Sequence, residues 1–149
     1  MKTILLSCVC FALIGSAASA YAADQPAGPN VIPTAQGSLV IHTIEHASFV
    51  MKWNGKVIAV DPVGGADAVA DFPKAGLVLI THAHGDHLSL DTIAAIAGGS
   101  ATLVAPSVVA EEFPEQQRKA IVELANGDKA TWEGITIEAV PAYNLDPAK

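Results

Sequence analysis

The chain has 149 residues, of which 51% are apolar and 15% charged, so a disordered tail is excluded and one domain of ordinary size is expected. The 8 Lys and Arg against 15 Asp and Glu give a formal net charge of -7 at pH 7. The sequence has no cluster of basic residues interleaved with aromatic residues, which argues against nucleic acid as a partner.

Residues 1–22 are predicted to be a signal peptide. Lys2 supplies a short positive region, residues 4–14 are apolar, and the small residues that follow offer Ala-x-Ala cleavage sites, with cleavage expected after Ala22. The alternative is an uncleaved anchor, since residues 4–23 are about long enough to cross a bilayer. We therefore expect an exported protein, periplasmic or extracellular, with no stable membrane anchor after cleavage.

The two cysteines, Cys8 and Cys10, both lie in the predicted signal peptide. The mature chain then has no thiol, which suits an oxidising compartment. Disulfide bonds and thiolate metal ligands are excluded on the same ground.

Residues 23–37 are rich in proline, glycine and small polar residues and show neither apolar periodicity. Such a segment is predicted to be a flexible leader. The folded domain is expected to span residues 38–149.

Alternating strand and helix patterns predict a layered α/β (α+β) fold. Asn54-Gly55 is typical of a two-residue hairpin turn, here between strands expected at 47–53 and 56–60. Residues 77–81 form a continuous apolar run, typical of a strand buried on both faces. The other elements expected in chain order are a strand at 38–44, a helix at 90–97 with Ser89 or Asp91 as N-cap and Gly98-Gly99 as its stop, a strand at 102–105, a short helix at 106–113, a strand at 121–124 and a final meander ending at 135–140.

The apolar run leads into a segment rich in metal-ligating side chains, Thr81-His82-Ala83-His84-Gly85-Asp86-His87, which holds three of the five histidines. Side chains two positions apart in extended backbone point to the same side, so His82 and His84 can reach one metal ion. Gly85 is expected to allow a sharp turn, after which Asp86 and His87 approach the same place. This donor set suits zinc, with iron, manganese or nickel left open, while an incidental histidine-rich surface is the alternative.

The pattern His-x-His-x-Asp-His at a strand end resembles the signature of the metallo-β-lactamase fold hydrolases. Within that superfamily the chain is most similar to the branch of L-ascorbate-6-phosphate lactonase-like hydrolases, through residues 44–49 (IEHASF), 60–62 (VDP) and 79–88 (LITHAHGDHL). The resemblance runs from about Ser38 to the end of the chain. It implies the N-terminal portion of a four-layer αββα sandwich whose second half is missing.

The resemblance also implies roles for single residues. His82 and His84 would bind a first metal ion, Asp86 and His87 would bind a second, and Asp61 would buttress the metal loop. Asp86 would in addition handle a proton during turnover.

Three residues before the motif stay open. His46 either shapes the pocket and contacts substrate or is structural. Glu45 is equally well explained as a solvated carboxylate. His42 is expected to be a strand residue that faces solvent.

The implied activity is metal-assisted hydrolysis of a small-molecule substrate, in which hydroxide on one or two zinc ions (or manganese or iron) attacks an ester, lactone, amide or phosphodiester. The chain departs from the family near its end, where Asn144, a poor zinc ligand, stands in the region that commonly supplies a third histidine. Weak metal binding and self-association through the uncovered surface are therefore expected. Three interpretations stay open: the amino-terminal part of a secreted metal-dependent hydrolase, whose activity without the second half is open; a non-catalytic metal-binding or interaction module; and two copies that complete each other.

Overall fold

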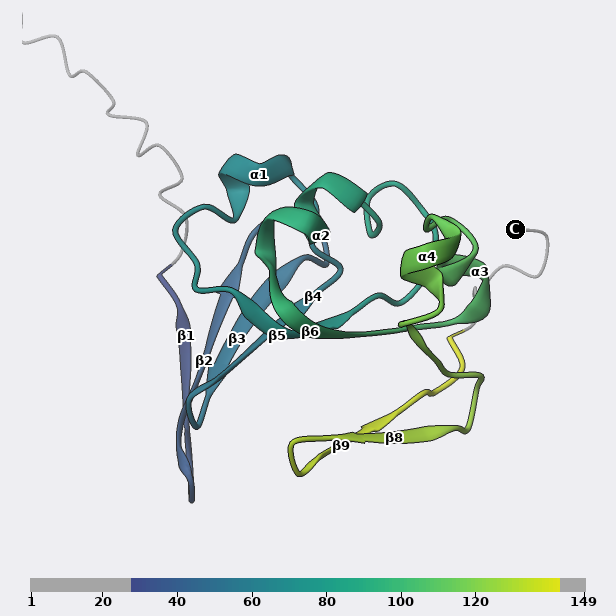
Figure 1. Cartoon of the computed structure of the whole chain (residues 1–149). Helices are drawn as coiled ribbons and strands as arrows, with labels where there is room; N and C mark the ends of the chain where they lie inside the picture. Colours follow the sequence, from purple (N-terminus) through teal and green to yellow (C-terminus); the bar gives the residue numbers. More distant parts are fainter. Residues whose placement is uncertain (1–27, 143–149) are drawn as a thin grey trace, which may run out of the picture.

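The computed structural model describes residues 28–142, so the predicted signal peptide, the start of the predicted leader and Asn144 lie outside the described residues. A seven-stranded sheet in the order β1-β2-β3-β4-β5-β6-β7 carries four short helices, and a separate two-stranded sheet follows (Figure 1). The strands are β1 (Asn30–Thr34), β2 (Gly37–Thr43), β3 (Phe49–Trp53), β4 (Lys56–Val60), β5 (Ala75–Leu79), β6 (Ala97–Ala105), β7 (Val122–Glu123), β8 (Lys129–Trp132) and β9 (Ile135–Glu138). The helices are α1 (Gly65–Ala68), α2 (Leu90–Ile96), α3 (Ser107–Ala110) and α4 (Glu115–Arg118). The layered α/β prediction is confirmed.

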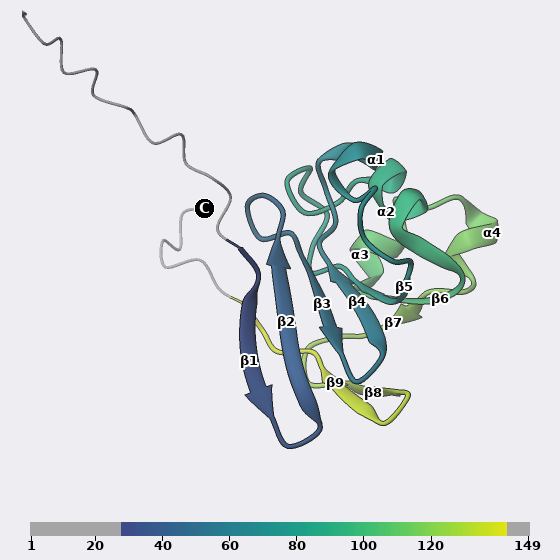
Figure 2. The same cartoon turned by 90° about the vertical axis from the view of Figure 1, so that its left-hand side faces the viewer.

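The first four strands form an antiparallel meander (Figure 2). The turn between β3 and β4 is the predicted one, because Trp53 pairs with Lys56 and both turn residues, Asn54 (φ 48°) and Gly55 (φ 74°), lie in the left-handed region. Positive φ at both central positions defines the type I′ hairpin turn, whose twist matches the flanking strands.

The prediction of a flexible leader up to residue 37 is wrong for its last part. Residues 30–34 form β1, which pairs along its whole length with β2. Every residue of β1 is exposed, so the strand is held by backbone hydrogen bonds and leaves no apolar periodicity in the sequence. That is why a composition-based reading missed it.

The second part of the sheet is parallel, with β5 between β4 and β6. Leu77 and Val78 are both 0% exposed and belong to separate apolar clusters, which confirms a strand buried on both faces. The strand spans Ala75–Leu79, two residues earlier than predicted. Since β4 and β5 run in the same direction, the residues that follow them emerge at the same edge of the sheet.

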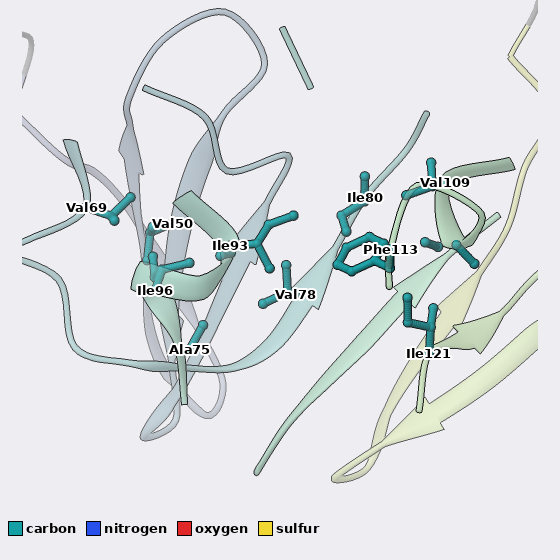
Figure 3. Packing of buried hydrophobic residues seen from close by; sticks show 13 residues of the cluster. Val50, Val69, Ala75, Val78, Ile80, Ile93, Ile96, Val109, Phe113 and Ile121 are labelled. Atoms are coloured by element: carbon teal, nitrogen blue, oxygen red, sulfur yellow. The ribbon is translucent and has the colours of Figure 1, made fainter. Parts of the chain in front are cut away.

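The helices cover one face of the sheet (Figure 1). Side chains from the sheet and from the helices interlock there in the main core, shown in Figure 3. In α2, Ile93 and Ile96 face the sheet, and Ser89 is the N-cap that accepts a hydrogen bond from the Thr92 backbone N–H. The Thr92 hydroxyl also accepts from the Gly65 N–H at 2.9 Å, which ties the start of α1 to α2.

The hairpin β8–β9 lies against the opposite face (Figure 1). Trp132 packs so closely on β5 that a Cβ at Gly76 would lie 2.9 Å from its ring. Lys56 adds an ion pair to Glu133 at 2.6 Å and lies 5.7 Å from the centroid of the Trp132 ring. The hairpin thus covers the apolar residues that the lower face of the central strands presents.

Two helices differ from the sequence analysis. Helix α2 ends at Ile96, and Gly98-Gly99 lies inside β6, where the pairing register with β5 shifts between Ala75 and Leu77. Helix α4 was not predicted, since its four residues, EQQR, expose no apolar stripe. Within residues 28–142, no helix is long and apolar enough to cross a bilayer.

Candidate metal centre

The histidine-rich segment is positioned by the ends of two parallel strands. Val60 pairs with Leu79, and directly beyond this pair the Asp61 N–H donates to the Leu79 carbonyl at 2.9 Å. Ile80 is tied to the next strand by a hydrogen bond to the Val104 carbonyl at 3.0 Å. Asp61 and Thr81 therefore enter the same site from adjacent strands, at the carboxyl edge where layered α/β proteins collect their ligands.

The turn after the strand is closed by one carbonyl. The His84 carbonyl accepts from the N–H groups of His87 and Leu88, both at 2.9 Å. Gly85 is not among the residues with positive φ, and a Cβ there would meet no atom within 4 Å. The predicted turn is present, but it does not use the conformational freedom of glycine, because it is closed by hydrogen bonds and leaves open space at this position.

Three predicted ligands converge. One ligand atom from each of His82, His84 and Asp86 lies within 4.8 Å of the other two. The His82 and His84 rings are edge to face, with centroids 4.7 Å apart. His84 and Asp86 are exposed and His82 is half-buried, so the cluster is open to solvent on one side.

His87 lies beside this cluster and is held from behind. Its Nδ1 is 2.8 Å from Asp61 Oδ2, while its Nε2 is 3.7 Å from Asp86 Oδ2. Its ring centroid is 3.9 Å from that of His82. Asp86 therefore lies close both to His87 and to the pair His82 and His84.

Asp61 is the buried anchor of the site, 1% exposed. Its Oδ1 accepts from the Thr81 N–H at 2.7 Å, and its Oδ2 accepts from the Thr81 hydroxyl at 2.7 Å and from His87 Nδ1. Because a carboxylate only accepts, His87 carries a proton on Nδ1, and in the neutral ring the lone pair is then on Nε2. Asp61 itself has φ 44°, a left-handed conformation that Asp and Asn tolerate better than most residues.

The surroundings of His82 favour its neutral imidazole form. Partial burial lowers the pKa of His82 below 6.5, and the neighbouring His87 and His84 lower it further, while Asp61 and Asp86 partly oppose the shift. Neutral imidazole is the form that binds metal ions, so the ring is prepared for this role near neutral pH.

The residues present fit a metal ion. Two nitrogen donors and one oxygen donor match the three protein ligands plus water of catalytic zinc sites. Bonds of about 2.1 Å in a tetrahedral site put ligand atoms roughly 3.4 Å apart, so the cluster would have to contract by at most about 1.4 Å from its 4.8 Å limit.

Within the described residues, no hydrogen bond or ion pair joins His42, Glu45 or His46 to His82, His84 or Asp86. His46 is exposed, with φ 47°, in a turn closed by the hydrogen bond from the Ser48 N–H to the Glu45 carbonyl. A Cβ added to Gly64 would lie 3.1 Å from Oε1 of Glu45, so the Glu45 carboxylate lies beside the start of α1. His42 is half-buried and packs edge to face on Phe72 at 5.3 Å, so the expectation that it faces solvent is wrong.

Thr81 was missed as a site residue. Its hydroxyl lies between Asp61 Oδ2 and His82 Nδ1, at 2.7 Å and 2.9 Å. Its position directly before the first histidine was the available signal, but hydroxyl residues at strand ends are too common to single out one of them.

The comparisons with known proteins agree with this geometry. Residues 40–148 match the β-lactamase superfamily domain. The chain belongs to the β-lactamase superfamily. The resemblance drawn from the His-x-His-x-Asp-His pattern is thereby confirmed.

Related proteins of this superfamily are metal-dependent hydrolases by name. A UPF0173 metal-dependent hydrolase of Pyrococcus abyssi is 34% identical over 105 residues, which are 66% of this chain and 45% of the relative. A similar protein of Pelotomaculum thermopropionicum is 33% identical over 103 residues, 66% of this chain and 44% of the relative. The chain thus spans about half the length of the curated relatives it matches.

Solved structures give the same fold. A protein of Parabacteroides distasonis, described as a metal-dependent hydrolase, superposes with a TM-score of 0.68 at 33% identity, over 80% of this chain and 53% of that one. Igni18, a metallo hydrolase from Ignicoccus hospitalis, superposes with a TM-score of 0.56 at 21% identity, over 74% and 52% of the two chains, and supports the fold alone. The layered sheet described above is therefore a portion of the metallo-β-lactamase fold.

Proposed function

We propose that this protein is a metal-dependent hydrolase, with its metal centre at the carboxyl ends of β4 and β5. The observation that carries the proposal is the convergence of His82, His84 and Asp86. The names of the relatives support it, although the chain covers about half of their length.

Each residue has a distinct part in the proposal. His82, His84 and Asp86 would hold the ion, and His87 would add a donor through Nε2 for a second ion close to Asp86. Zinc suits these donors best, with manganese or iron as the other candidates. A bound ion of this kind supplies Lewis-acid polarisation and lowers the pKa of water.

Proton movement is assigned to Asp86. Its carboxylate is half-exposed and lies 3.7 Å from His87 Nε2, so it can accept a proton released during hydrolysis and pass it to solvent. Asp61 keeps His87 in one orientation and tautomer during this step, through the hydrogen bond of 2.8 Å to Nδ1. The substrate is a small molecule with an ester, lactone, amide or phosphodiester group.

Metal content is the first test. Elemental analysis of the protein, produced without a His-tag, is expected to give one or two ions per chain and to identify the metal. The double variant His82→Ala/His84→Ala should lose the ions. His42→Gln is the matched control, since it removes a histidine that packs on Phe72 and should keep the metal content. Equal metal content in the parent and the double variant would refute the site.

Turnover is the second test. Hydrolysis of a chromogenic lactone, a p-nitrophenyl ester and bis(p-nitrophenyl) phosphate is compared between the parent and His84→Ala, with added zinc or manganese. Loss of turnover in His84→Ala with retention in His42→Gln supports the hydrolase. Stoichiometric metal with no turnover on any substrate contradicts it and supports a metal-binding module instead.

A further inference from the structure

The Thr81 side chain connects the buried carboxylate of Asp61 to the first histidine of the metal cluster. We propose that Thr81 is a positioning residue, whose hydroxyl keeps the proton of His82 on Nδ1 so that Nε2 presents a free lone pair to the metal. The proposal rests on the metal centre proposed above. It assigns a task to a residue that the metal-ligand pattern leaves out.

The direction of each hydrogen bond follows from the chemistry of the three groups. An ionised carboxylate only accepts, so the single hydroxyl proton of Thr81 is donated to Asp61 Oδ2, across 2.7 Å. The same oxygen of Thr81 can then only accept from His82, across 2.9 Å. His82 Nδ1 must therefore carry the proton, and Nε2 is the atom left for a metal ion.

Oδ2 of Asp61 thus orients both His87 and His82, but in two different ways. His87 Nδ1 reaches Asp61 Oδ2 directly at 2.8 Å, whereas His82 reaches it through the Thr81 hydroxyl. The Thr81 backbone N–H, at 2.7 Å from Oδ1, holds the carboxylate in place independently of the side chain. Removing the hydroxyl should consequently affect His82 and spare His87.

This difference provides a test that a purely structural role would not pass. Thr81→Val keeps the shape of the side chain and the backbone hydrogen bond but removes the hydroxyl. Thr81→Ser keeps the hydroxyl and is the matched control. Should Thr81→Val fail to fold, as judged by circular dichroism, Thr81→Ala removes the same hydroxyl with a smaller side chain.

The first readout is the tautomer of each ring in the metal-free protein. Long-range proton–nitrogen correlation spectra of protein with ¹⁵N-labelled histidine, recorded at pH 8, distinguish protons on Nδ1 from protons on Nε2. The parent and Thr81→Ser should show both rings protonated on Nδ1. In Thr81→Val, His82 should shift to a large Nε2–H population while His87 stays unchanged. An unchanged His82, or an equal change of His82 and His87, would overturn the proposal.

The second readout is zinc affinity, measured by competition with a chromophoric chelator. Loss of a residue that orients a ligating histidine typically weakens binding about 10–100-fold, and this is the loss expected for Thr81→Val. Thr81→Ser should stay within about threefold of the parent. If the parent itself binds no zinc, the proposed function fails, whereas the tautomer spectra still decide the role of Thr81.

Discussion

Replacement of Asp61 by asparagine should reverse the proton arrangement of the metal centre. Asn has nearly the shape of Asp and tolerates positive φ, so the backbone at φ 44° should be kept. The amide oxygen can still accept from the Thr81 N–H, while the amide NH₂ takes the place of Oδ2 and donates where the carboxylate accepted. His87 Nδ1, 2.8 Å away, must then accept, which moves the proton to the metal-facing Nε2.

The size of the effect follows from the two hydrogen bonds made by Oδ2. Hydrogen bonds to a charged group contribute about 1.5–3 kcal/mol, against about 0.5–1.5 kcal/mol for neutral pairs. Two such exchanges at a residue that is 1% exposed predict a loss of about 2 kcal/mol in the free energy of unfolding. Removal of the buried negative charge offsets part of this loss. Zinc affinity should fall about 100-fold, the upper end of the usual range, because both histidine tautomers change.

Urea unfolding of the metal-free protein and competitive zinc titration measure the two quantities separately. Asp71→Asn, on the exposed segment before β5, is the matched control for loss of one carboxylate and should change neither. Zinc affinity of Asp61→Asn within threefold of the parent would refute the reasoning. It would show that metal binding by Nε2 of His82 and His87 does not depend on the side chain at position 61.

Three further predictions test other parts of the structure. Gly76→Ala places a Cβ 2.9 Å from the Trp132 ring and should lower the free energy of unfolding by about 1–3 kcal/mol and change the tryptophan emission. Gly99→Ala, whose Cβ would have no atom within 4 Å, is the control. Unchanged stability and emission in Gly76→Ala would show that the β8–β9 hairpin does not pack on β5. Gly85→Ala should keep the metal content and change the free energy of unfolding by less than about 0.5 kcal/mol, since its Cβ would also meet open space. Loss of metal in this variant would show that the turn needs glycine. In the metal-free protein the NMR titration of His82 should have its midpoint below pH 6.5. Because the folded state favours the neutral ring, the contribution of His82 to the free energy of unfolding is complete above pH 6.5 and is lost as the pH falls through the folded pKa. A midpoint at or above pH 6.5 contradicts the burial and repulsion described for this ring.

Local features of the sequence were sufficient for several elements. Asn54-Gly55 determines its hairpin because both residues tolerate positive φ, and the apolar run determines β5 because both faces of that strand are covered. The convergence of His82, His84 and Asp86 could also be predicted, since their spacing within one short segment decides which side chains can meet. Interactions of this kind span a few residues and leave a signal in composition or periodicity.

Other features depend on residues far apart in the chain and were decided by the tertiary structure. Strand β1 has no apolar pattern and exists through its pairing with β2. The parallel pairing of β4 with β5 brings Asp61 next to Thr81 and His87, so that one buried carboxylate holds two residues of the histidine-rich segment. The sequence by itself determined which donors this protein has; the packing of the sheet decided which ring nitrogen of His82 and of His87 is hydrogen-bonded, because Asp61 and Thr81 meet from neighbouring strands.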